Sequence, residues 1–292
     1  CEIITEAANS RLSRGAGRVQ MLRIPGAGVV EKALKMLEDA GQLILVGSKP
    51  PVAFFGYPDK PSLLYKEGTP IYILSENDED IYSALADLVE ELDAVSLSPA
   101  YIAEYKRPEL PKGNISKEKI AQIIGAVLEE NTIVVDESVT TGRDFFPFTA
   151  GAPKHDWLNN RGGSIGYGMP VAIGASIACP NRKVLLLEGD GSGMYTVQSL
   201  WTMVRENLNV IVLIFANRSY EILRGELTNV GVKNPGPKAI DMLTLDRPYI
   251  NWVNMAKGMG LNAIKVDSCE NLTKSIKTAF KEEGHFLIEI LM

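Results

Sequence analysis

Short apolar runs alternate along the chain with segments whose apolar residues recur at helical spacing. The clearest runs are residues 184–187 and 210–216. Uninterrupted runs of this length are typical of strands that are covered on both faces of a parallel sheet. Residues 195–207 lie between them and have helical spacing, which predicts the crossover helix of a βαβ unit. The alternation therefore predicts an α/β fold with doubly wound parallel sheets.

The same pattern continues toward both ends of the chain. Upstream, it predicts strands at residues 1–5, 43–47 and 71–74 and helices at 29–40 and 80–92. The helix at 80–92 is expected to turn four residues inward: Ile81, Leu85, Leu88 and Val89. Downstream, it predicts a helix capped by Ser116, further helices at 251–259 and 271–280, and strands at 132–135, 263–266 and 286–291.

The distribution of proline and glycine predicts two domains and one long loop. Residues 98–114 are rich in proline and charge and are expected to form a linker. They separate a domain at residues 1–97, which has the elements of half a doubly wound unit, from a second domain at residues 115–292. Residues 227–245 are rich in glycine, proline and asparagine and are expected to be a loop, either at an active site or on the ordinary surface.

Polar residues follow the two clearest apolar runs directly. Gly189-Asp190-Gly191-Ser192 follows the run at 184–187, and Asn217 follows the run at 210–216. Neighbouring parallel strands end at one edge of a sheet, where ligands collect, so Asp190 and Asn217 are expected to come together. One carboxylate and one amide oxygen suit Mg²⁺ that also binds substrate phosphates, and the backbone carbonyl of Ser219 is a third candidate ligand. The less specific interpretation is a simple junction between a strand and a turn.

These motifs resemble the cofactor-binding domain of the thiamine-diphosphate-dependent 2-oxo acid enzymes, among them acetohydroxyacid synthase, pyruvate oxidase and benzoylformate decarboxylase. The family motif is Gly-Asp-Gly, a spacer and then an asparagine, usually in an Asn-Asn pair, where this chain has Ala216-Asn217. Residues 161–175 and the triplet Asp136-Glu137-Ser138 resemble two further family blocks. The resemblance covers residues 115–292 well. Residues 46–55 resemble, more weakly, the central domain of the acetolactate-synthase-like branch.

The resemblance implies a site for thiamine diphosphate and Mg²⁺. It assigns the metal to the side chains of Asp190 and Asn217 and the carbonyl of Ser219. It assigns the cofactor to Gly163, Ile165, Gly189, Gly191, Ser192 and Tyr220. In this family a bulky apolar residue lies beneath the thiazolium and forces the bent cofactor conformation, and Ile165 matches it. The resemblance implies that the carbonyl of Gly163 accepts a hydrogen bond from the aminopyrimidine and that Gly191 and Ser192 contact the diphosphate. Tyr220 would pack near the diphosphate or the mouth of the active site.

One position departs from the pattern and one part is missing. Val139 stands where relatives can carry a hydroxyl residue, so that contact would fall to Thr140 or Thr141. The glutamate that activates the cofactor in this family belongs to a pyrimidine-binding domain, which residues 1–100 do not resemble. Glu137 and Glu188 are weaker stand-ins, since a loop or cap suits the first and a local ion pair or hydrogen bond suits the second. The chain is thus expected to be a carboxyl-terminal fragment, or a subunit that needs the pyrimidine-binding domain from elsewhere.

The resemblance leaves four functions open. The first is decarboxylation of a 2-oxo acid with carboligation, as in an acetolactate synthase large subunit. The second is decarboxylation without ligation, as in benzoylformate decarboxylase, and the third is a non-catalytic cofactor-binding or assembly module. The fourth, a nucleotide-binding α/β protein, lacks the last glycine of G-x-G-x-x-G, because Met194 stands there. A homodimer or homotetramer is expected, because sites in this family form between subunits.

Composition narrows the expected partners. The net charge of −6 argues against a nucleic-acid groove or an anionic membrane surface. Three scattered cysteines without metal spacing indicate reduced thiols and a cytoplasmic protein. His155 is expected to be an exposed loop residue, and a pair with the distant His285 is not expected. Some relatives hold FAD in the central domain, but the chain shows no complete flavin fingerprint, so that domain is expected to be structural.

Overall fold

The computed structural model describes residues 1–26 and 29–292, and the chain divides into two compact units. The amino-terminal unit comprises residues 1–7, 21–101 and 225–234. The carboxyl-terminal unit comprises residues 8–20, 102–224 and 235–292. In the described residues, none of the helices has the length and apolar character that crossing a bilayer requires.

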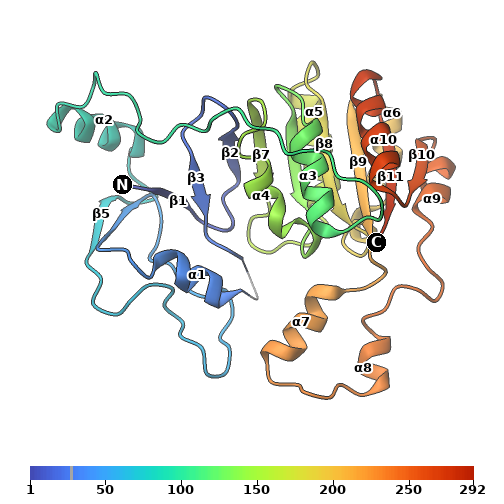
Figure 1. Cartoon of the computed structure of the whole chain (residues 1–292), viewed down its shortest axis with the longest axis horizontal. Coiled ribbons are helices and arrows are strands. Elements are labelled where there is room, and N and C mark those ends of the chain that lie inside the picture. Colours follow the sequence, from blue (N-terminus) through green and yellow to red (C-terminus); the bar gives the residue numbers. More distant parts are fainter. Residues whose placement is uncertain (27–28) are drawn as a thin grey trace. The chain divides into compact units, whose positions relative to one another are not determined.

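The carboxyl-terminal unit is built on a seven-stranded sheet of order β10-β11-β9-β8-β6-β7-β2 (Figure 1). Its strands are β2 (Arg11–Arg14), β6 (Ile133–Glu137), β7 (His155–Asn159), β8 (Val184–Gly189), β9 (Val210–Ala216), β10 (Asn262–Val266) and β11 (Phe286–Leu291). Six of these strands run parallel, and β2 joins the edge antiparallel to β7. The predicted α/β fold with a parallel sheet is therefore confirmed, and β2 is an addition that the sequence did not predict.

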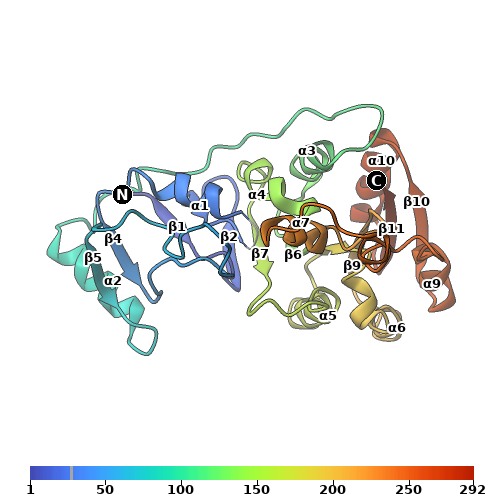
Figure 2. The same ribbon diagram turned by 90° about the horizontal axis from the view of Figure 1, so that it is seen from below.

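Helices cover both faces of this sheet (Figure 2). The helices of the unit are α3 (Lys117–Val127), α4 (Phe145–Phe148), α5 (Gly168–Ala178), α6 (Ser199–Arg205), α8 (Pro237–Asp241), α9 (Trp252–Gly258) and α10 (Cys269–Lys281). In Figure 2, α3 and α10 lie above the sheet, and α5 and α6 lie below it. Two short 3₁₀ helices, η1 (Thr141–Asp144) and η2 (Gly193–Thr196), follow the ends of β6 and β8.

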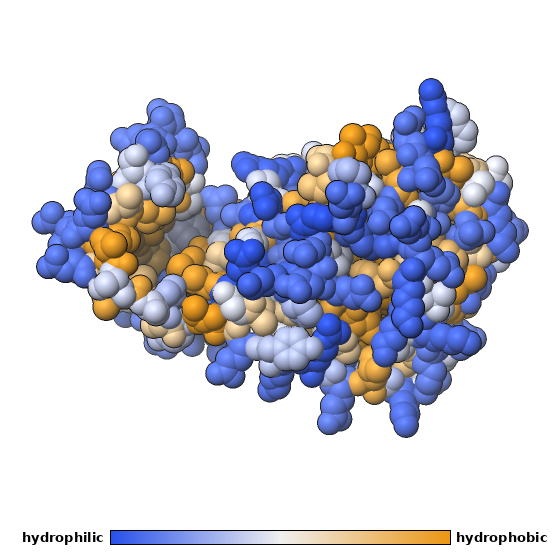
Figure 3. Space-filling model, turned by 90° about the horizontal axis from the view of Figure 1, so that it is seen from above, coloured by the Kyte–Doolittle hydropathy of each residue, from blue (hydrophilic) through white to orange (hydrophobic). Residues whose placement is uncertain are grey.

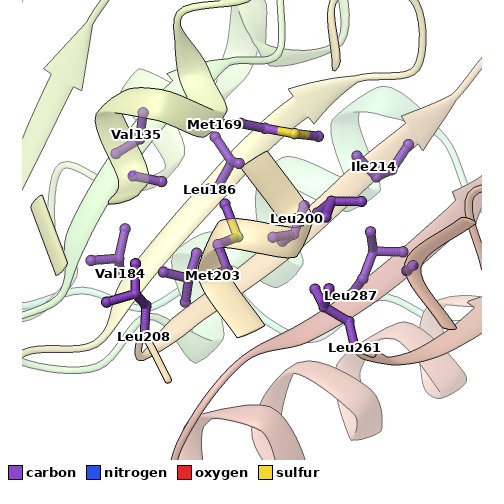
Figure 4. Packing of buried hydrophobic residues seen from close by; sticks show 14 of the residues in the cluster. Val135, Met169, Val184, Leu186, Leu200, Met203, Leu208, Ile214, Leu261 and Leu287 are labelled. Carbon is purple, nitrogen blue, oxygen red and sulfur yellow. The ribbon is translucent and has the colours of Figure 1, made fainter. Parts of the chain in front are cut away.

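The core under α5, α6 and α9 explains why the apolar runs form strands. All seven residues of β9 are buried. Those on one face of the strand, such as Ile214, form one apolar cluster with Val184, Leu186 and Met169 and with Leu200 and Met203 of α6 (Figure 4). A strand that is buried on both faces needs no polar alternation, which accounts for the continuous runs. The predicted Ser116 cap is confirmed, because the Ser116 hydroxyl accepts a hydrogen bond from the Lys119 N–H.

The amino-terminal unit contains two separate parallel strand pairs and a small core. One pair is β1 (Ile3–Thr5) with β3 (Met21–Arg23), and the other is β4 (Leu43–Val46) with β5 (Ile71–Ser75). Its helices are α1 (Val30–Leu37) and α2 (Ile81–Glu91), while α7 (Glu221–Asn229) begins in the other unit and ends in this one. The core is formed by Val30, Ala33, Leu37, Tyr57 and Leu64.

Three expectations need correction. None of the residues of α2, all of which the structure describes, is buried, and Leu85 and Val89 are about two-fifths exposed instead of turned inward. The expected loop at 227–245 contains α8 and the end of α7. His155 is a buried strand residue, because its position starts β7 between β6 and β2.

Candidate functional site

The predicted metal and diphosphate residues follow β8 and β9, two adjacent central strands that end beside β6. The order β9-β8-β6 makes β8 the middle strand, so the ends of all three lie side by side. The chain adds β7 on one side of β6 and then crosses to add β8 on the other, which makes β6 and β8 the switch point at which such sheets bind ligands. The carbonyl of Phe215 accepts the N–H groups of both Asp190, at 3.3 Å, and Asn217, at 3.1 Å. The two predicted metal ligands are thus tied to one backbone carbonyl.

Asp190 has a buried carboxylate, and few hydrogen bonds offset the cost of burying its charge. The residue is only 3% exposed, and its Oδ2 accepts the N–H of Arg218 at 2.7 Å. Arg218 has a φ of 57°, a left-handed conformation that a non-glycine residue seldom adopts. Burial raises the pKa of Asp190 to about 6, against the lowering effect of backbone N–H groups, and the charge of Glu289 adds to the increase. A cation at this oxygen would relieve the cost of its burial.

The amide of Asn217 is held in one orientation. Its Nδ2 donates to Glu221 Oε2 at 3.3 Å, and Glu221 also receives Lys117 Nζ at 2.9 Å. Its Oδ1 accepts the N–H of Ser219 at 2.9 Å, which leaves a second lone pair on that oxygen. Sequence reasoning missed Lys117 and Glu221, which hold this amide. Glu221 lies four positions after Asn217, but Lys117 lies 104 positions before Glu221, and no spacing rule connects those two.

The loop after β9 is tied to residues 243–245 around the third candidate ligand. The N–H of Tyr220 donates to the carbonyl of Leu243 at 3.0 Å, and the N–H of Leu245 donates to the carbonyl of Arg218 at 2.8 Å. The hydroxyl of Ser219 also donates to the Leu243 carbonyl, at 3.0 Å. These bonds use groups on either side of the Ser219 carbonyl and hold that stretch of backbone in place.

The glycines after β8 permit close contacts that other residues would prevent. A Cβ on Gly191 would lie 2.6 Å from Tyr220 Cε1, and a Cβ on Gly189 would lie 2.9 Å from Ser192 Oγ. Tyr220 therefore packs directly against the backbone at Gly191. The hydroxyl of Ser192 donates to Glu188 Oε1 at 2.5 Å, so it points into the protein. The backbone N–H of Ser192 is then the group that a diphosphate could use.

The turn before α5 exposes one apolar side chain. Gly162, Gly163 and Gly166 all have positive φ angles, so the turn needs glycine at these positions. Ile165 lies among them and is 47% exposed, although Gly166 and Gly168 beside it are buried. A branched apolar side chain without protein cover is suited to packing against a bound ring.

Glu137 and Glu188 form a buried acidic pair beneath this turn. Glu137 is 3% exposed and Glu188 is fully buried. Burial raises the pKa of Glu137, against the hydrogen bonds from Gly168 and Gly166, and burial together with the charge of Glu137 raises the pKa of Glu188 well above its usual range. The predicted local hydrogen bond of Glu188 is confirmed, since its Oε1 accepts both the Ser192 hydroxyl and the Gly189 N–H. Both carboxylates accept hydrogen bonds from groups of the chain itself, which favours a supporting role for them over the activating role.

The loop after β6 is strained at the position that departs from the family pattern. Val139 has a φ of 50°, which is an outlier for a β-branched residue. Such strain is concentrated at functional sites, because the surrounding structure must enforce it. Of the two threonines considered as substitutes, Thr141 is buried with its hydroxyl against Met292 Sδ at 3.8 Å, and Thr140 is partly exposed. Thr140 is the better placed of the two for a ligand.

The donor set suits one kind of cation. Within the described ranges, no group of three or more histidine, cysteine, aspartate or glutamate side chains is placed to hold a metal ion. Asp190 therefore offers a single negative charge, with neutral oxygens from Asn217 and Ser219 beside it. Mg²⁺ tolerates so few protein ligands when phosphate oxygens and water complete its octahedral shell.

Comparison with known proteins agrees with this geometry. Residues 141–290 match the family model described as "Thiamine pyrophosphate enzyme, C-terminal TPP binding domain". A Mycobacterium tuberculosis protein named "Putative acetolactate synthase large subunit IlvX" is 44% identical over 282 residues, which are 96% of this chain and 54% of the relative. A Pseudomonas aeruginosa benzoylformate decarboxylase is 28% identical over 214 residues, 72% of this chain and 39% of the relative.

A solved structure shares the fold over nearly the whole chain. The thiamine diphosphate-dependent 4-hydroxybenzoylformate decarboxylase of Rhodococcus jostii RHA1 superposes with a TM-score of 0.77 at 22% identity. The superposition covers 99% of this chain and 55% of that structure. The chain thus spans about half the length, or less, of these three relatives.

Proposed function

We propose, from the premise that the chain belongs to the thiamine pyrophosphate enzyme family through its C-terminal TPP-binding domain, that it binds thiamine diphosphate with Mg²⁺ and acts on 2-oxo acids. The cofactor would bind at the ends of β6, β8 and β9. The observation that carries the proposal is the buried carboxylate of Asp190 beside the oriented amide of Asn217, both tied to the Phe215 carbonyl.

The residues at these strand ends fit the diphosphate half of the cofactor. Asp190 and Asn217 would hold the cation by their side chains, and Ser219 would hold it by its carbonyl. Gly189 and Gly191 bring backbone close to the diphosphate, and the Ser192 N–H would donate to it. Because a Cβ on Gly191 would collide with Tyr220, the close approach of backbone at this point depends on glycine.

The residues of the turn fit the ring half. Ile165 would support the bound ring by shape, and the carbonyl of Gly163 would accept from the aminopyrimidine. When bound, thiamine diphosphate supplies a nucleophilic carbon and an electron sink for loss of carbon dioxide from a 2-oxo acid. The chain's residues bind the cofactor, orient it and set its conformation.

We favour decarboxylation with carboligation, as in an acetolactate synthase, over decarboxylation alone. The support is the 44% identity, spread over 96% of the chain, to the relative named as an acetolactate synthase large subunit. The benzoylformate decarboxylase relative keeps simple decarboxylation as the second candidate. The products formed from pyruvate separate the two, since ligation yields an acetolactate and simple decarboxylation yields an aldehyde.

We further propose that a pyrimidine-binding domain completes the site and supplies the activating glutamate. The support is that the relatives are about twice as long as this chain or longer, and that Glu137 and Glu188 are both engaged by groups of the chain itself. The complete assembly would be a homodimer or homotetramer in the cytoplasm. FAD has no support from the described residues and is not part of the proposal.

The test is a calorimetric titration with thiamine diphosphate, with and without Mg²⁺, of the chain alone and with a relative's pyrimidine-binding domain. Asp190→Asn keeps an acceptor for the Arg218 N–H but removes the charge. Its affinity should fall at least about 100-fold, or roughly 2.7 kcal/mol. Asp267→Asn, at an exposed aspartate of the same unit, is the matched control and should bind as the wild type does. Binding that needs neither Mg²⁺ nor Asp190 would overturn the proposal.

A further inference from the structure

The turn that carries Ile165 is unusually well held for a turn whose central side chain is exposed. On one side, Asn160 bonds Ser164 twice: its Oδ1 accepts the Ser164 N–H at 3.0 Å, and its Nδ2 donates to the Ser164 carbonyl at 2.7 Å. On the other side, the N–H of Gly166 donates to Glu137 Oε1 at 2.6 Å, and the carbonyl of Gly166 accepts the Thr196 hydroxyl at 2.9 Å. Both peptide neighbours of Ile165 are therefore fixed.

Glu137 holds this turn with both of its carboxylate oxygens. Oε1 accepts the N–H of Gly166, and Oε2 accepts the N–H of Gly168 at 2.5 Å. A carboxylate can accept from two N–H groups at once, whereas an amide offers one oxygen and a donor. A Cβ on Gly168 would lie 2.8 Å from Glu137 Oε2 and 2.5 Å from Glu188 Oε2, so glycine permits the backbone to lie directly on the acids.

The same acids connect the turn to the diphosphate loop. Glu137 Oε2 and Glu188 Oε2 both lie against the backbone at Gly168, and Glu188 Oε1 accepts the Ser192 hydroxyl and the Gly189 N–H. Thr196, which holds the Gly166 carbonyl, belongs to the η2 helix that follows this loop. Buried side chains thus connect the turn that carries Ile165 with the loop that carries Gly191.

We infer that Glu137 is a positioning residue, whose carboxylate fixes the turn at residues 163–168 and so sets the place of Ile165 relative to the diphosphate loop. The inference rests on the proposed cofactor site and adds a role for a residue that touches neither the cation nor the diphosphate in that proposal. Binding groups must be held closely in place by supporting side chains to act on a ligand ring, and a buried two-oxygen acceptor does this. A helix cap alone would not need the additional bond from the Gly166 N–H to Glu137.

The test compares two ligands that use different halves of the site, magnesium thiamine diphosphate and magnesium pyrophosphate. Glu137→Gln removes one acceptor from the turn, so the affinity for thiamine diphosphate should fall about 10-fold, while that for pyrophosphate should change less than about 2-fold. Hydrogen exchange of the unliganded chain should accelerate about 10-fold at residues 163–168 and remain unchanged at residues 171–178 of α5.

Glu289→Gln is the matched control, because Glu289 is also a buried strand carboxylate and accepts the Val253 N–H near the start of α9. It should leave exchange at residues 163–168 unchanged. If Glu137→Gln does not fold, Thr196→Val removes the bond to the Gly166 carbonyl and should shift both readouts in the same direction by a smaller factor.

Each outcome decides the inference. Equal losses of both ligands, unchanged affinities, or acceleration that spreads through α5 would overturn it. A wild-type chain that binds neither ligand, both alone and with a relative's pyrimidine-binding domain, would overturn the proposed function, and the exchange at residues 163–168 would still show whether Glu137 fixes the turn.

Discussion

Strands β9 and β4 have equally apolar sequences but different environments. Every residue of β9 is buried, because β8 and β11 flank the strand and helices cover both faces of the sheet. Among the residues that the structure describes, strand β4 pairs with β5 alone, and Ile44 is half exposed, while Tyr72 and Ile73 of β5 are 57% exposed. The apolar run therefore predicts a strand in both units, but the number of neighbouring layers decides whether that strand is buried.

Helices α10 and α2 show the same contrast in burial between the two units. Both are amphipathic, yet five residues of α10 are buried and none of α2 is. Hydrophobic side chains reach the surface of the amino-terminal unit, on the left in Figure 3, and include Phe54, Phe55 and Leu92. Large exposed apolar areas mark surfaces that bind other protein segments. This is what the proposed completion by a further domain would require.

The largest expected effect comes from removing the same side chain in each unit. Ile214→Ala, at a fully buried site in β9, should lower the free energy of unfolding by about 4 kcal/mol, whereas Ile73→Ala in β5 should cost less than about 1 kcal/mol. All three tryptophans, Trp157, Trp201 and Trp252, lie in the carboxyl-terminal unit, so fluorescence during urea unfolding measures the effect of Ile214→Ala. Far-ultraviolet circular dichroism registers the helices and strands of both units and measures the effect of Ile73→Ala. A comparable shift from Ile73→Ala would contradict the contrast between the units.

A smaller effect tests whether residues 8–20 belong to the carboxyl-terminal unit. The Arg14 guanidinium lies 3.4 Å from the Phe146 ring centroid and donates to Thr149 Oγ1 at 2.8 Å. Arg14→Ala should lower the fluorescence-monitored stability by roughly 2–3 kcal/mol, because it leaves buried acceptors unpaired. Arg18→Ala, at an exposed arginine of the same segment, should change it by less than about 0.5 kcal/mol. Equal effects of the two substitutions would show that β2 contributes little to the sheet.

The smallest effect depends on pH. Burial lowers the pKa of His155 from 6.5 to about 4, and the charge of Arg14 adds to the decrease. Because the folded state disfavours protonation, the contribution of neutral His155 is complete above pH 6.5 and is lost as the pH falls toward 4. Between about pH 7.5 and pH 5, the wild type should lose roughly 2 kcal/mol more stability than His155→Gln.

Urea titrations monitored by fluorescence at both pH values would measure this difference. His285→Gln is the control, since His285 is only partly buried, and burial lowers its pKa against the effect of a hydrogen bond with the Leu208 backbone. A wild type and a His155→Gln variant with parallel pH profiles would mean that the imidazole is accessible to water in solution.

Much of the candidate site could be predicted from local patterns. The strand ends at Gly189 and Ala216 follow from apolar runs, and Asp190 and Asn217 follow the runs directly. The supports of the site could not be predicted in the same way. Glu137 reaches Gly166 across 29 positions and Lys117 reaches Glu221 across 104, and no periodicity connects such pairs. The burial of His155 likewise depends on β2, whose Arg14 lies opposite His155 in the sheet although it comes from near the start of the chain.

The sequence by itself determined which segments become strands and helices and which side chains stand at the strand ends, because these properties depend on residues within a few positions of one another. Only the tertiary structure decided which apolar faces are covered and how the site residues are held. Burial and buried hydrogen bonds depend on the elements that pack together, and sheet order places side by side residues that the sequence keeps far apart.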